Sequence, residues 1–499
     1  MAGSEALYRF LTGKLKEREV PVESLPKVLG ISRSTLYRNM KGTAHMLPHV
    51  QAKFADIMGL DDDGRAEFER LLGLATFDAT MVQARDIVDR FVFPGQYRAP
   101  EARSAPLRFA LYDQDVFLRT ADEIYAQIRE LAAAPGASTL VRIIDCTAER
   151  WFGSVAAFVE DLLANIGDVT VEHLLTLSHT DYAATASTFT RIVPLLGFDR
   201  YSVCYGEQPV GDTTHILGHV VGIEIDRPGE PTTGFMLSFV DDDLCTALKT
   251  ADRAVLGFFH ANFDAAKRGY GEALVDTGID AFNGTLADLE ENTDVYIVKQ
   301  DFCFERVPMS VYQAVMTRAG VTDLAMAQQL WAGLGGDPAT SVETVLSTLD
   351  RRARASDTHR HIDVCSVAGL TQFARTGRLT DHLDFIPSFN EAERAAILRH
   401  ALVRNNDKTD PYTLYITRDA LLPDGHIAMV LEDVGVVLEY NPDDYQRGLL
   451  SNLFIDNKTL AEIFSDYVRN HFPEAHAMSQ DDTNAFLTSL IDELTSSTE

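Results

Sequence analysis

The chain has 499 residues, of which 46% are hydrophobic and 24% are charged. These values are ordinary for globular proteins and exclude a largely disordered chain, and the length predicts about two to four domains. Lys and Arg number 44 and Asp and Glu number 74, and the resulting net charge of −30 excludes a protein that coats nucleic acid or an anionic membrane.

The charge is unevenly distributed along the chain. The first sixty residues hold nine basic and five acidic side chains, a net charge of +4, while the remaining 439 residues carry −34. Phosphate repels an acidic body, so any contact with DNA would be left to the N-terminal segment.

Cysteine usage and hydropathy indicate the cellular setting. The five cysteines are widely spaced, without a CxxC pair: Cys146, Cys204, Cys245, Cys303 and Cys365. We therefore expect reduced, mostly buried thiols. No apolar run approaches the roughly 18 residues of a membrane span, and the N-terminus lacks the pattern of a signal peptide. A soluble, cytoplasmic protein that does not bind membranes is expected.

The spacing of apolar residues predicts five helices in the first 75 residues, at about 5–19, 25–29, 33–40, 48–58 and after 61–63. Gly30 breaks the second helix, and the Ser32 hydroxyl is placed to cap the third. Leu36 and Met40 of the third helix face inward. Pro26 fits the first turn of a helix that begins near Ser24.

The segment from Glu23 to Gly42, ESLPKVLGISRSTLYRNMKG, resembles the helix-turn-helix of the Cro/phage-repressor (XRE-type) regulators. In that family a short helix ends in Leu-Gly-Val-Ser, and a recognition helix with an Arg/Ser/Thr-rich first turn follows. The resemblance covers about 70 residues and implies a sequence-specific DNA-binding transcriptional regulator whose second helix enters the major groove.

The positions of side chains in this motif suggest their roles in DNA binding. The outward-facing candidates for reading bases are Arg33, Ser34, Thr35, Tyr37 and Arg38, because arginine in particular pairs with guanine O6 and N7. The candidates for phosphate contacts are Lys27, Ser32, Lys41 and Thr43. Since two heads on one duplex double the phosphate contacts, we expect a homodimer on a two-fold site in double-stranded DNA.

The rest of the chain predicts a large mixed α/β body, α+β overall. A helix at about 79–90 and a proline-rich linker at 94–106 precede it. The βαβαβ order over 140–205 favours a parallel sheet, and 215–226 with 232–240 predicts a hairpin.

The last third of the chain has a similar order. Before it, a strand is predicted at about 294–299 and helices over most of 309–355. Within it, strands are predicted at about 361–366, 412–417, 426–432 and 436–440. Helices are predicted at about 391–403, after a capping box at Ser388–Glu391, and at 460–472 and 486–494. Both halves thus place a strand–helix unit before a hairpin and an aromatic-bearing helix. Two related lobes are one interpretation of this order, but a true duplication is not favoured because no residue-level motif recurs.

We therefore divide the chain into a helix-turn-helix domain (1–75), a helix and linker (76–106), and two α/β lobes (107–325 and 326–499). The first lobe is expected to sense an effector or to dimerise. If the lobes are duplicates, a cleft between them is a common location for a ligand.

Catalytic signatures are missing from the sequence: it has no GxxxxGK[ST] loop, GxSxG elbow or HExxH motif. No catalytic residue, cofactor or metal is predicted. Weaker candidates are Asp145 and Cys146, which end a predicted parallel strand where α/β proteins place ligands, the triplet Asp241–Asp243, which could cap a helix or hold a cation, and His359 with His361, which are either surface histidines or a sensor.

Two alternatives to a transcriptional regulator stay open. The body could be an α/β enzyme that the helical segment regulates, or the protein could be an interaction component, of a defence type, that uses the helix-turn-helix as an adaptor. The effector, a small molecule or a protein, is not indicated by any motif.

Overall fold

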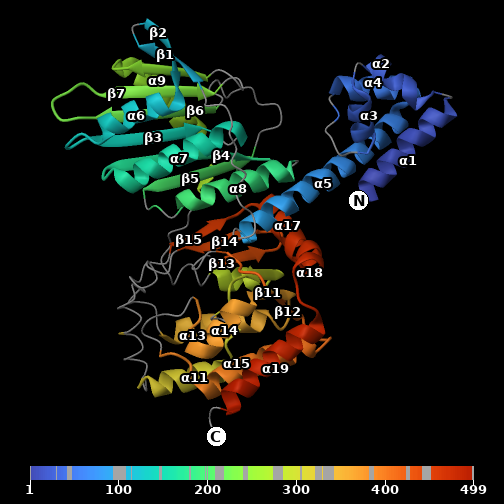
Figure 1. The fold of residues 1–499 in the computed structure, drawn as a ribbon, viewed down its shortest axis with the longest axis vertical. Helices are drawn as coiled ribbons and strands as arrows, with labels where there is room; N and C mark the ends of the chain where they lie inside the picture. The colour runs from blue at the N-terminus through green and yellow to red at the C-terminus, as the bar shows by residue number, and fades with distance from the viewer. Residues whose placement is uncertain are drawn as a thin grey trace. The chain divides into compact units, whose positions relative to one another are not determined.

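The computed structural model (Figure 1) describes residues 2–93, 108–144, 149–207, 219–239, 245–272, 285–320, 329, 342–380, 387–422, 427–440 and 451–496, with short gaps at 19, 30, 42–45, 47, 114, 179–180, 197, 199 and 304–305. Two compact units are present. One comprises residues 1–87 and 178–187, and the other comprises 88–177 and 188–499.

The first unit contains the predicted N-terminal helices. They are α1 (Ala2–Glu17), the 3-10 turn η1 (Val22–Ser24), α2 (Leu25–Leu29), α3 (Arg33–Met40), α4 (Pro48–Met58) and the start of α5 (Asp62–Val92). The fifth helix and the helix predicted at 79–90 are one continuous element, so the domain boundary predicted after residue 75 falls inside α5.

One hydrophobic core joins these helices, and we call this part of the chain, residues 2–75, the head. Leu11 of α1, Leu36 of α3 and Phe54 of α4 are fully buried in it. Leu25 begins α2, so Pro26 lies in the first turn, where no backbone donor is lost. Leu36 and Met40, which were predicted to face inward, are fully buried, whereas Val28 of the second predicted stripe is 57% exposed.

The second unit begins with a nine-stranded mixed sheet, the first lobe. Its strands are β1 (Arg108–Asp113), β2 (Asp115–Thr120), β3 (Ser138–Ile144), β4 (Val169–Leu177), β5 (Tyr201–Glu207), β6 (His219–Asp226), β7 (Thr233–Phe239), β8 (Cys245–Thr250) and β9 (Gly271–Glu272). The helices are α6 (Ala121–Ala132), α7 (Glu149–Asn165), α8 (Tyr182–Leu196) and α9 (Arg253–Lys267). The strands β3, β4 and β5 are parallel and β6 and β7 form a hairpin, which confirms both predictions for this segment.

A six-stranded mixed sheet forms the second lobe. Its strands are β10 (Val295–Val298), β11 (His361–Ser366), β12 (Tyr412–Thr417), β13 (Ile427–Leu431), β14 (Gly435–Tyr440) and β15 (Ser451–Ile455). The helices are α11 (Met309–Arg318), α13 (Val342–Ala355), α14 (Val367–Thr376), α15 (Glu391–Asn406), α17 (Lys458–Asp466), the π-helix η3 (Tyr467–His471), α18 (Phe472–Ala475) and α19 (Gln480–Ser496).

Two details of this lobe differ from the expectation. The strand β10 pairs with β11 and β13, so the second sheet begins about 30 residues before the boundary predicted at 325/326. The capping box of α15 consists of Asn390 and Glu393 instead of Ser388 and Glu391, because the helix begins at Glu391 and its third residue is Glu393.

The two lobes share one topology. The first sheet contains the order β8-β7-β6-β3-β4-β5, and the second sheet has the order β15-β14-β13-β10-β11-β12. In each lobe the last three strands of this series are parallel and the others antiparallel. The mixed α/β body therefore consists of two lobes built on a duplicated sheet.

The lobes can be aligned from Tyr201, the first residue of β5, and Tyr412, the first residue of β12. This choice aligns Val141 of β3 with Val295 of β10. It matches four polar or charged positions: Arg142 with Tyr296, His173 with Asp363, Tyr201 with Tyr412, and Glu224 with Glu432. Only the last two pairs are identical residues, so the lobes share a topology without a longer residue-level motif.

The coincident positions make equivalent contacts. Tyr201 Oη lies 2.7 Å from His173 Nδ1, and Tyr412 donates to Asp363 Oδ2 at 3.0 Å. Glu224 contacts His260 of α9, while Glu432 accepts from Arg469 of η3. Each lobe thus has one buried tyrosine bond between parallel strands and one charged contact to its C-terminal helical segment.

The cores of both lobes are apolar. The four cysteines that the structure describes, Cys204, Cys245, Cys303 and Cys365, are buried, as expected. Among the described helices, none is both long and apolar enough to span a lipid bilayer.

Candidate functional site

The predicted recognition helix is α3, and local sequence accounts for its start. Ser32 has an extended backbone, and its Oγ accepts a hydrogen bond from the Thr35 backbone N–H at 3.0 Å. Before the turn, the Ile31 N–H donates to the Pro26 carbonyl at 3.1 Å and closes α2. Gly30 itself lies outside the described residues. The cap satisfies an otherwise unpaired amide and so defines the first residue of α3 as Arg33.

The base-reading candidates of α3 differ in exposure. Arg33 is exposed, and its guanidinium lies 5.9 Å from the ring centre of half-buried Tyr37. Thr35 is half-buried, and its hydroxyl lies 2.7 Å from that of Ser32. The backbones of Ser34 and Arg38 belong to α3, but their side chains lie outside the description. Arg33 is thus the described side chain of this set that is most available to a partner.

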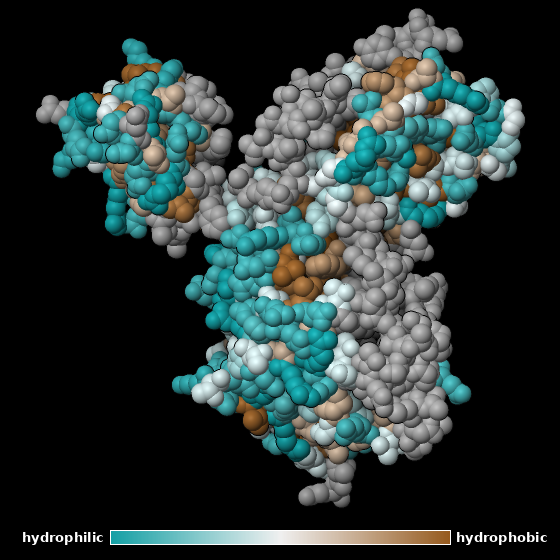
Figure 2. Space-filling view, turned by 180° about the vertical axis from the view of Figure 1, so that it is seen from behind, coloured by the Kyte–Doolittle hydropathy of each residue, from teal (hydrophilic) through white to brown (hydrophobic). Residues whose placement is uncertain are grey.

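The phosphate candidates flank α3. Lys27 on α2 and Lys41 just after α3 are both exposed. Ser32 is exposed as well, but its hydroxyl serves as the helix cap, and Thr43 lies outside the described residues. On the face shown in Figure 2, hydrophilic residues cover most of the head. Two lysines and one arginine of this helix pair and its flank are therefore exposed.

A buried ionic network lies in the second lobe, and apart from His361 the sequence indicated none of its residues. Arg352 donates to both Glu290 carboxylate oxygens, at 3.0 and 3.1 Å, and both residues are 1% exposed or less. A second arginine, Arg306, lies 3.9 Å from the same carboxylate. Buried charges persist in proteins only when they are paired in this way.

His361 belongs to this network and is not a surface histidine. It is 1% exposed, and its Nε2 lies 3.2 Å from Asp363 Oδ1. Burial, helped by the charge of Arg306, lowers the pKa of His361. Burial alone would raise the pKa of Asp363, but His361, Arg306 and the Tyr412 hydroxyl outweigh it and hold that pKa below its usual value. His359, by contrast, is half-buried beside Asp294.

Several buried polar atoms here have no well-aligned hydrogen-bond partner among the described residues: Nε and one terminal nitrogen of Arg306, and Nε2 of His361 and Oδ1 of Asp363, which face each other at 3.2 Å. Such atoms are normally satisfied by ordered water or by a small polar molecule. Burial raises the pKa of the nearby Cys365 thiol well above the usual value, which disfavours its nucleophilic thiolate form. The network could therefore bind a small polar ligand, but it offers no activated nucleophile among the described residues.

The other weak candidates from the sequence fall outside the description. Asp145, Cys146 and Asp241–Asp243 all lie in segments that the structure does not describe.

One group of described residues could hold a metal ion, and the sequence did not indicate it. It consists of Asp89, His471 and His476. The aspartate lies 382 residues before the first histidine, and a spacing of five between histidines does not place them on one face of an α-helix. The π-helix that ends at His471 is the local feature that could have marked this site, but π-helices are rarely recognised from sequence.

No known protein-family profile matches the chain, and no curated protein matches its sequence. Among the solved structures that match is one described as phosphatidylserine synthase from Haemophilus influenzae Rd KW20. It is 12% identical, with a TM-score of 0.24, over 78% of this chain and 95% of that one. A TM-score this low does not establish a common fold.

Proposed function

We propose that this protein is a sequence-specific DNA-binding transcriptional regulator, in which the head reads DNA and the two-lobed body binds an effector or dimerises. The observation that carries the proposal is the α2–α3 pair. Its second helix is capped by Ser32, is anchored in the core by Leu36 and Met40, and presents Arg33 to solvent.

The dimensions of α3 suit a DNA groove. Eight residues at 1.5 Å each give a helix about 12 Å long, comparable to the width of the major groove. Arg33 lies in the first turn, from which recognition helices contact base edges. Lys27 and Lys41 are exposed on either side and would contact phosphates, which position the helix without specifying sequence.

The charge of the molecule supports selective binding by the head. The first sixty residues carry +4 and the rest carries −34, so the body adds no attraction for phosphate. Non-specific affinity should be weak, and discrimination should rest on a few side chains of α3. The buried polar atoms beside His361 favour a small polar molecule as the effector of the second lobe.

Selection from random duplexes with the full-length protein tests the proposal. We expect one enriched sequence, and Arg33→Ala should lose about 1–3 kcal/mol of discrimination at one base pair, roughly 5- to 150-fold in affinity ratio, when binding is measured by fluorescence anisotropy.

The matched control is Arg9→Ala, which removes an equally exposed arginine from α1, where it pairs with Glu5. It should leave both affinity and discrimination unchanged. Failure to enrich any sequence, or equal losses in the two variants, would overturn the proposal.

A further inference from the structure

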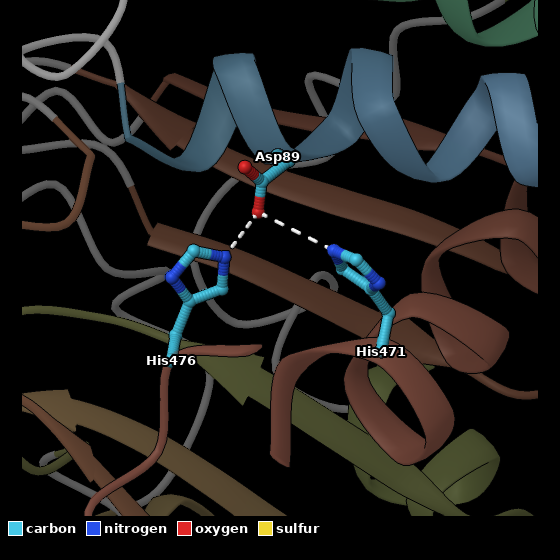
Figure 3. Close-up of side chains that lie close together, drawn as sticks. All are labelled: Asp89, His471 and His476. Carbon is cyan, nitrogen blue, oxygen red and sulfur yellow. Dashed lines mark hydrogen bonds and ion pairs between the residues drawn. The ribbon is translucent and has the colours of Figure 1, made fainter. Parts of the chain in front are cut away.

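Three imidazole and carboxylate groups from distant parts of the chain converge in the second unit (Figure 3). Asp89, near the end of α5, is 4% exposed, and its Oδ1 lies 2.6 Å from Nε2 of His476 and 3.8 Å from Nε2 of His471. The Tyr467 hydroxyl donates to the same oxygen at 2.7 Å. A buried carboxylate thus meets two histidine nitrogens and one phenol.

We propose that Asp89, His471 and His476 form a binding site for a divalent transition-metal ion, of which Zn²⁺ is the best match. Their three ligand atoms all lie within 4.8 Å of one another. Neutral imidazole nitrogen with carboxylate oxygen is a donor set that suits Zn²⁺ and its neighbours in the first transition row.

The distances fit a metal after small movements of side chains. With bonds of about 2.1 Å, tetrahedral ligand atoms lie about 3.4 Å apart. The Asp89–His476 distance of 2.6 Å must widen and the Asp89–His471 distance of 3.8 Å must shorten, each by less than about 1 Å. Rotations of the three side chains supply such changes without moving the backbone.

The local helical structure brings the two histidines together. His471 ends the π-helix η3, and the four residues of α18 carry the chain to His476. An uninterrupted α-helix would place residues five apart on different faces, about 140° from each other. The wider turn and the short helix after it instead set the two imidazole rings 6.1 Å apart, and such π segments occur frequently at functional sites.

The surroundings resemble those of metal centres. The Tyr467 hydroxyl orients the carboxylate of Asp89, as hydrogen bonds to ligating carboxylates commonly do. Aromatic rings of Phe93 and Phe472 lie 4.4 and 5.8 Å from the ring of His476, and both phenylalanines are fully buried. Three protein ligands leave a fourth position for water or a solute, which is the arrangement of sites that bind or sense a further ligand.

Metal titration of the full-length protein, first stripped with a chelator, tests the inference. We expect one Co²⁺ per chain, with visible absorption bands typical of tetrahedral coordination, and displacement by Zn²⁺. Asp89→Asn, His471→Ala and His476→Ala should each weaken binding at least 100-fold. Tyr467→Phe should weaken it by about 10- to 100-fold, as loss of an outer-shell partner does.

The matched control is His359→Ala, which removes a half-buried histidine that also lies beside an aspartate, Asp294. It should bind Co²⁺ like the wild type. A measurement on the unsubstituted protein avoids the risk that a variant unfolds. The Co²⁺-bound protein should show two shifted, exchangeable imidazole N–H resonances, one for each histidine. If no stoichiometric metal binds, or if the variants lower thermal stability while leaving metal affinity unchanged, the cluster is a hydrogen-bonded ion pair and the inference is overturned.

Discussion

The tyrosines Tyr201 and Tyr412 occupy the same position in the two lobes but meet different partners. Tyr201 bonds His173, and burial lowers the pKa of that histidine to about 3, so the imidazole is neutral at physiological pH. Tyr412 donates to Asp363, whose pKa is held below its usual value and which is therefore ionised. The two equivalent tyrosine hydroxyls thus bond a neutral imidazole in the first lobe and an ionised carboxylate in the second.

This difference predicts unequal effects of one substitution. Tyr412→Phe leaves an ionised buried carboxylate without its donor and should cost about 1.5–3 kcal/mol, whereas Tyr201→Phe should cost about 0.5–1.5 kcal/mol. Both variants remove one hydroxyl from a tyrosine that is 5% exposed or less, so each serves as the control of the other. Urea unfolding of the full chain measures the two costs, and equal values would contradict the assignment of charge to Asp363.

Local sequence predicted those elements whose boundaries are defined by nearby residues. The helix α3 begins and ends where Ser32 and the apolar pair Leu36 and Met40 indicated. The strand β8 was missed, because Cys245–Thr250 lacks a run of β-branched residues and gains its place only by pairing with β1 and β7. Two separate helices were predicted within α5 because no single apolar stripe continues along its 31 residues.

The glycine that ends α14 allows a prediction at the scale of single helices and strands. Gly377 caps the helix with a left-handed backbone, φ 70°, and a Cβ there would lie 2.1 Å from the Phe389 carbonyl oxygen. Gly320, after α11, has a similar φ of 77° but open space around it. Gly320→Ala should therefore cost about 1 kcal/mol of unfolding free energy, from the backbone conformation alone, and Gly377→Ala clearly more. Thermal unfolding compares the variants, and equal shifts in Tm would rule out the steric contribution.

At the scale of the whole molecule, the sequence predicted two lobes with a similar order of elements but did not favour a duplication and could not align the two lobes. The equivalence of Glu224 with Glu432, or of Tyr201 with Tyr412, depends on which residues pair across strands, and connections of different length separate the strands in the two lobes. Asp89, His471 and His476 were invisible for a related reason, since only the folded chain brings them together. The helix α3 could be predicted because all the residues that determine its start and end lie within twenty positions of one another.

The opposite charges of the first sixty residues and the rest of the chain lead to a prediction about salt. If the head alone contacts phosphates, each contact releases counterions, and the logarithm of the binding constant falls with the logarithm of salt concentration by about 0.9 per contact. Lys27→Ala removes one exposed lysine beside α3 and should make this slope shallower by about 1.

The control variant Lys408→Ala makes the same change of charge at an exposed position in the second lobe and should leave the slope unchanged. Anisotropy titrations at several salt concentrations measure both slopes. Equal changes would mean that binding follows the net charge of the whole protein, and an unchanged slope for Lys27→Ala would remove that lysine from the DNA interface.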